Sequence, residues 1–130
     1  MTALDKAIYD KYNADVALKA ALPGGLHADS APQDTAFPFG VWLWLNNMNE
    51  LTFNSEGDDA SLQFSIFSKS QSVAEVDNAA DKLKACFDEA TLTITGYHSI
   101  RMMRVLERRI KDPEEAWHYF AEYRILTQKQ

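Results

Sequence analysis

The stretch LQFSIFSKSQSVAEVDNAADKLKACF, from Leu62 to Phe87, changes its apolar period partway along. In its first part Leu62, Phe64 and Ile66 alternate with polar residues, the period of two that is typical of a half-buried strand. Beyond Ser72 the apolar residues recur three or four positions apart, which predicts an amphipathic helix. A strand that runs directly into such a helix indicates an α+β fold, with the helix packed on a sheet.

The helix is predicted over residues 72–89, with a start and an apolar face that can be named. Ser72 followed by Glu75 is the pattern of a capping box, in which each residue satisfies a backbone N–H of the other. The residues expected on the buried face are Val73, Val76, Ala80, Leu83 and Phe87.

Two hairpins are expected around this strand and helix. Residues 37–45 alternate with large apolar side chains on both faces, and we expect them to pair with the strand at 62–67. Residues 100–110 and 116–127 form the second hairpin, joined by a turn at Asp112 and Pro113. An N-terminal helix begins near Leu4 and is recapped at Asp15, and a short strand is possible at 26–28. The prediction is a single α+β domain over residues 1–130, with an antiparallel or mixed sheet of four to five strands and two main helices packed on one face.

The chain is acidic, and its excess of acidic residues is confined to one region. Nineteen acids against thirteen bases give a net charge of −6, and residues 20–68 contain six acids but no Lys or Arg. Four of these acids belong to an Asn-rich segment, predicted as a long exposed loop over residues 46–59: Glu50, Glu56, Asp58 and Asp59. The alternative is a solvated hairpin tip. Because acids repel phosphates, a sequence-reading DNA-binding protein is not expected.

No residue pattern predicts catalysis, a metal site or a cofactor. The single Cys86 cannot form a disulfide within the chain, and there is no Gly-x-Ser-x-Gly motif or phosphate-binding glycine loop. No stretch has the apolar run of a signal peptide or a membrane span, so we expect a soluble protein without a membrane partner. A small enzyme or ligand-binding domain is the alternative, and its candidate residues are His27, His98 and His118 with Asp29 or Glu115.

Two groups of residues call for a structural explanation. Four arginines in the penultimate strand, Arg101, Arg104, Arg108 and Arg109, have acids nearby in sequence, and cross-strand ion pairs are predicted for them. Trp42 and Trp44, with Met48, make both faces of their strand apolar, whereas one helix layer covers only one face. They form either a candidate subunit interface or a face covered by another helix or loop.

The order of these features resembles the small tail-completion or tail-terminator proteins of long-tailed bacteriophages and prophages. The residues that carry the resemblance are Asn13-Ala14-Asp15, Leu22-Pro23-Gly24-Gly25, Ala31-Pro32, Phe37-Pro38-Phe39, the strand Leu62 to Phe67 leading into the helix Ser72 to Phe87, Arg104, Arg108, Asp112 and Tyr123 to Leu126. The resemblance implies a structural virion-assembly protein without enzyme activity. It also implies a ring, usually a hexamer, at the head-proximal end of the tail tube, which joins tail to head. Another neck or minor tail component of the same fold is the third possibility.

The resemblance further implies partners and a location. The partners are other copies of the chain, the tail tube and head-neck connector proteins, and DNA passes through the ring without specific binding. The protein would be found in the virion at the tail-neck, and in the host bacterial cytoplasm during assembly. In such a ring, Glu50, Glu56, Asp58 and Asp59 are expected to face the lumen, where acids keep the wall from holding DNA. The competing account is that these acids dock on basic residues of the tail tube.

Overall fold

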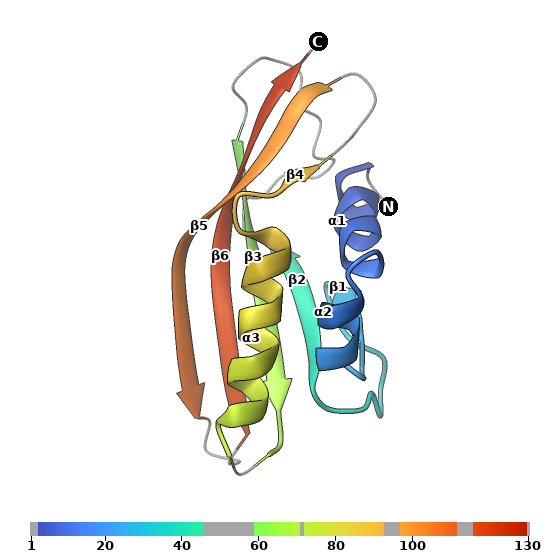
Figure 1. The fold of residues 1–130 in the computed structure, drawn as a ribbon, viewed down its shortest axis with the longest axis vertical. Coiled ribbons are helices and arrows are strands. Elements are labelled where there is room, and N and C mark those ends of the chain that lie inside the picture. Colours follow the sequence, from blue (N-terminus) through green and yellow to red (C-terminus); the bar gives the residue numbers. More distant parts are fainter. Residues whose placement is uncertain (1–2, 46–58, 71, 93–96, 112–115, 130) are drawn as a thin grey trace.

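A computed structural model describes residues 3–45, 59–70, 72–92, 97–111 and 116–129 of the chain. Across these residues it has three helices and six strands (Figure 1). The helices are α1 (Ala3–Asn13), α2 (Val16–Ala21) and α3 (Ala74–Phe87). The strands are β1 (Leu26–Ala28), β2 (Phe39–Trp44), β3 (Asp59–Ser68), β4 (Thr91–Leu92), β5 (Tyr97–Lys111) and β6 (Trp117–Lys129).

The strands form one mixed sheet in the order β1-β2-β3-β6-β5-β4. β1 pairs with β2 in parallel and every other pairing is antiparallel, which confirms the α+β class and both predicted hairpins. β1 lies at the short strand expected over residues 26–28. The sixth strand, β4, was not predicted, because two residues are too few for a periodic pattern. The helix number differs because the N-terminal helix is interrupted between Asn13 and Val16, where the side chain of Asp15 caps α2 as predicted.

The helices lie on one face of the sheet, and the core is between the two layers (Figure 1). Leu62, Phe64 and Ile66 of β3 are fully buried, as their alternation predicted. The Phe64 ring stacks on Phe87 of α3 at 4.6 Å and meets the edge of Tyr123 of β6 at 5.4 Å between ring centroids. α2 contacts α3, so the N-terminal helices extend the same layer over β1 and β2.

The start of α3 is built differently from the predicted capping box. The helix begins at Ala74, and Val73 at its N-cap makes no side-chain cap. The Ser72 hydroxyl accepts from the Ala74 N–H at 3.1 Å, and Glu75 accepts from the Ser68 hydroxyl at 2.8 Å. Glu75 therefore ties the helix to the end of β3. The predicted buried face of the helix is confirmed at Val76, Ala80, Leu83 and Phe87, which are all buried, whereas Val73 at the N-cap is only partly buried.

The chain's one thiol belongs to this core. Cys86 is buried on α3, and burial raises the pKa of its thiol to about 12. The thiol is therefore protonated and unreactive near neutral pH. Among the described helices, none is long and apolar enough to cross a membrane.

Candidate assembly surface

Strand β2 separates two kinds of environment. Trp42 points into the core and is only 2% exposed, and Trp44 packs against the same core. Both indole N–H groups donate to one carboxylate oxygen, Asp5 Oδ1 of α1, each at 2.9 Å. Trp42 is thus almost fully buried beneath α1 and Trp44 is half-buried, and a role of these residues in a subunit interface stays a prediction. Met48 lies outside the described residues.

Asp5 was not singled out from the sequence, and its role can be tested. We expect Asp5→Ala to lower the free energy of unfolding by about 1–3 kcal/mol, because two indole donors lose their acceptor at the edge of the core. Asp5→Asn, which keeps a carbonyl oxygen, is expected to recover part of the loss. Urea unfolding followed by tryptophan fluorescence measures both variants.

The control for this substitution is Asp10→Ala, which removes an exposed carboxylate paired at 2.7 Å with Lys6 on the same helix. Such a surface pair contributes about 0.5 kcal/mol or less. Equal losses in the two α1 variants would mean that the carboxylate does not hold the tryptophans.

The opposite side of the sheet, which we call the outer face, has a continuous aromatic row. Phe39 of β2 is in register with Phe67 of β3, Phe67 with His118 of β6, and His118 with Ile110 of β5. The ring centroids of Phe39 and Phe67 are 5.2 Å apart, and those of Phe67 and His118 are 4.5 Å apart. The histidine that the sequence offers as a catalytic candidate thus stacks within this row.

The outer face is also unusually apolar for an exposed sheet. Its partly exposed apolar side chains are Leu43, Met103, Val105, Leu106 and Ile110, each 36–47% exposed. All three described helices pack on the other face, so no described helix covers these side chains. An exposed apolar surface of this kind marks an interaction site in soluble proteins.

One end of the outer face is hollowed into a pocket of about 590 Å³, which we call the connector pocket. Its floor is formed by Phe39, Val41 and Phe67, and its wall by the connector of residues 29–37 between β1 and β2. Gly24 lets that connector pass close by, since a Cβ at this position would lie 1.9 Å from the Ala36 carbonyl oxygen.

The rim of the connector pocket carries charge. Asp29 and Asp34 are exposed on the connector, and both have left-handed backbone conformations with φ of 64° and 63°. Lys69, which follows β3, lies over the Phe37 ring at 4.6 Å from its centroid. Two carboxylates and one ammonium group thus surround an apolar floor.

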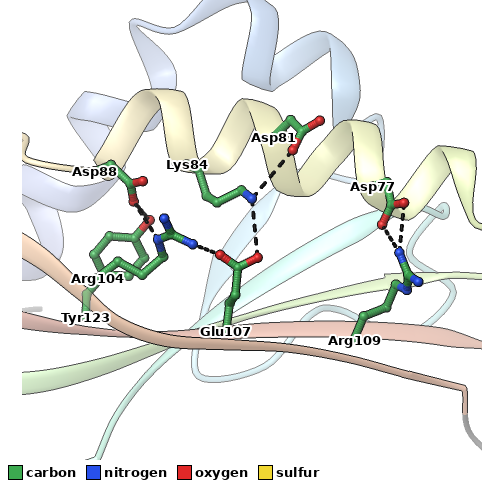
Figure 2. A network of polar contacts seen from close by, with 8 residues as sticks. All are labelled: Asp77, Asp81, Lys84, Asp88, Arg104, Glu107, Arg109 and Tyr123. Atoms are coloured by element: carbon green, nitrogen blue, oxygen red, sulfur yellow. Dashed lines mark hydrogen bonds and ion pairs between the residues drawn. The ribbon is translucent and has the colours of Figure 1, made fainter.

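At the other end of the sheet, ion pairs tie β5 to α3 (Figure 2). Arg109 pairs with Asp77 at 2.6 Å, and Lys84 pairs with Glu107 at 3.3 Å. Arg104 pairs with Asp88 at 3.3 Å and also with Glu107. Among the described residues these pairs differ from the predicted cross-strand pairs: Arg109 pairs with α3, and Arg104 pairs with the residue after α3 and with Glu107 of its own strand. Asp112, Glu114 and Glu115 lie outside the described residues, so pairs with them stay a prediction.

The reason for this difference is a β-bulge. The register between β5 and β6 shifts between Arg104 and Leu106, so that Arg104 and Arg109 face the same side although five positions separate them. Arg101 reaches the end of α3, where it pairs with Glu89 at 2.7 Å. Regular alternation would have placed Arg104 and Arg109 on opposite faces.

These pairs are partly exposed, so each contributes at most about 1 kcal/mol to stability. Together they fix the position of β5, which pairs with β4 only at Thr91 and Leu92 and is otherwise bonded on one side. Tyr123 adds a buried contact, because its hydroxyl donates to Asp88. Burial and this hydrogen bond raise the pKa of Tyr123 far above its usual value.

The other predicted site residues are distributed as follows. Glu50, Glu56 and Asp58 lie outside the described residues, and Asp59 begins β3 rather than ending a loop. His27 Nε2 lies 2.7 Å from the Gly24 carbonyl oxygen, so the imidazole ring is hydrogen-bonded to the turn that precedes β1. Glu115 and the side chain of His98 are outside the described part of the structure. Among the described residues, no three His, Cys, Asp or Glu side chains gather into a metal site.

Solved structures with this fold include proteins of phage and phage-like particles. The chain is similar to one in the virion of a native gene transfer agent particle, with a TM-score of 0.75 and 14% sequence identity over 97% of this chain and 95% of that chain. It is also similar to the gp17 protein of bacteriophage SPP1, with a TM-score of 0.63 and 18% identity over 95% of this chain and 88% of that chain. At these identities the likeness establishes the fold. No curated protein matches the sequence.

The chain thus shares its fold with a protein of a gene transfer agent virion and with gp17 of bacteriophage SPP1. The sequence profile described as tail completion protein gp17 matches residues 6–128, nearly the whole chain. The chain belongs to the tail completion protein gp17 family, and its role is a structural one in completing a phage tail.

Proposed function

We propose that this protein is a tail terminator, a subunit of a ring that closes the head-proximal end of a tail tube and joins it to the head. It acts by binding and not by catalysis. The observation that supports the proposal best is the apolar outer face, which the chain's own described helices leave open. Family membership gives that surface its context, because completing a tail requires contacts with other virion subunits.

A ring needs a contact between two different surfaces of the same subunit. Such a head-to-tail contact leaves one surface of each type free, so that addition of subunits continues until the circle closes. The outer face offers two distinct surfaces. One is the connector pocket at β2, and the other is the set of exposed apolar side chains on β5. The expected assembly is a hexamer, formed in the bacterial cytoplasm and then present in the virion.

The experiment is mass photometry of the full chain, followed by negative-stain electron microscopy. We expect closed rings, with a hexamer as the main species at micromolar concentration, and we expect the rings to cap the ends of purified tail tubes. A protein that is monomeric at high concentration and leaves tube ends open would contradict the proposal.

The acids Glu50, Glu56, Asp58 and Asp59 are proposed to line the lumen of the ring. Acids at a channel wall repel phosphates and let DNA pass, and salt screens such a field within about 8–10 Å. Replacing all four by Gln or Asn should leave capping intact and change DNA passage, measured as ejection rate from assembled particles. Loss of capping would favour the competing account, in which these acids dock on the tail tube.

A further inference from the structure

The β5 edge of the outer face carries an arginine, Arg108, whose surroundings differ from those of the other arginines of β5. Arg101, Arg104 and Arg109 of β5 each pair with an acid on or next to α3. Arg108 points to the outer face, in register with Phe120, and it makes no ion pair with any residue in the described part of the chain. It is exposed and lies between Leu106 and Ile110, which alternate with it on the same face.

The connector pocket has the complementary pattern. Its floor is apolar, and Asp29 and Asp34 on its wall are exposed and have no ion pair among the residues that the structure describes. At the β5 edge of the sheet, two apolar side chains flank a cationic one on the outer face. At the β2 edge, the connector pocket combines an apolar floor with two carboxylates that have no ion pair among the described residues.

These two surfaces cannot meet within one copy. Three strand spacings of about 4.8 Å separate β2 from β5, and both surfaces belong to one rigid sheet. Two copies that are displaced across the strands can bring these surfaces together, and in such an arrangement each copy keeps one surface of each type free. This is the head-to-tail arrangement that closes into a ring.

We propose that Leu106, Arg108 and Ile110 of one copy dock in the connector pocket of a second copy, with Arg108 facing Asp29 and Asp34. This inference rests on the proposed ring function and identifies the surface that makes the ring. Opposite charges orient the two surfaces as they approach, and the leucine and isoleucine bury apolar area on the pocket floor.

The first test is a charge swap. Asp34→Arg and Arg108→Asp should each weaken assembly by about threefold to tenfold, because an attraction becomes a repulsion at every contact of the ring. The double variant should assemble better than either single variant. Lys19→Asp is the matched control, since Lys19 is exposed on α2, away from the outer face. A control that weakens assembly as much as Arg108→Asp would overturn the proposal by showing that only net charge matters.

The second test identifies the contact directly. Asp34→Cys and Arg108→Cys chains are expressed together and treated with a short bismaleimide, with each variant alone as control. Covalent dimers are expected only from the mixture, and native Cys86 does not compete because it is buried and protonated.

The outcomes separate this inference from the proposed function. Rings that give no mixed covalent dimer would overturn the proposed contact but would still support the proposed ring. Monomers throughout, without cross-links, would overturn both.

Discussion

Replacing Trp42 with alanine is expected to lower the free energy of unfolding by about 3–5 kcal/mol, the largest single effect on stability that we expect in β2. The indole is buried between the sheet and the helix layer, so its removal leaves a cavity in the centre of the core. The substitution also removes one of the two indole N–H groups that donate to Asp5 of α1. The alanine variant is therefore expected to be marginally stable.

The matched control is the next residue, Leu43, whose side chain points to the outer face and is 43% exposed. Leu43→Ala should cost about 1 kcal/mol or less, since part of its apolar surface is already in water. Urea unfolding, followed by circular dichroism, compares both variants without relying on tryptophan as a reporter. Similar losses at the two positions would mean that Trp42 is not more deeply buried than Leu43.

This pair of residues also shows what the sequence can and cannot predict. Alternation in residues 37–45 correctly separates Trp42 from Leu43, because side chains along a strand point to opposite faces. It does not say which face the helices cover, since both sets are large and apolar. The sequence leaves a subunit interface and cover by a helix or loop both open for the tryptophans, and in the structure Trp42 donates to a carboxylate of α1 that lies 37 positions away in sequence. Contacts between distant segments are set by tertiary packing, which a local pattern does not contain.

The arginines of β5 show a second limit. A regular strand would alternate them between faces, and the bulge between Arg104 and Leu106 changes that alternation in the middle of the strand. A bulge has no strong sequence signal here, because neither glycine nor proline occurs near it. As a consequence, Arg104, Glu107 and Arg109 all face α3, and Arg108 lies on the outer face.

The ion pairs between α3 and β5 hold the outer face of β5 in a fixed position. Within the described residues, β5 pairs with β4 at Thr91 and Leu92 and is otherwise bonded only to β6, so most of its length is an edge of the sheet. The ion pairs to Asp77 and Lys84 of α3 and to Asp88 at its C-cap hold the inner side of β5 at three points (Figure 2). The outer side is then presented as a rigid surface, which lowers the entropy lost when a partner binds.

Replacing both Leu106 and Ile110 with glutamine is expected to weaken assembly by about tenfold or more and to leave the fold intact. These side chains are 47% and 36% exposed, so their loss removes little of the core. In an interface they would be buried apolar anchors, and such positions dominate the free energy of association. Glutamine keeps the side-chain length and adds no charge, so the effect is independent of the charge swap at Arg108.

The control is Val16→Gln, because Val16 is 80% exposed on α2, on the helix-covered side of the molecule. The control should assemble like the unmodified chain in mass photometry, and the double variant should be mainly monomeric at the same concentration. Circular dichroism and urea unfolding should show a stability change of about 1 kcal/mol or less in both, which excludes unfolding as the cause. Normal rings from the double variant would mean that β5 faces solvent in the assembly, and the interface would then have to be sought on the helix layer.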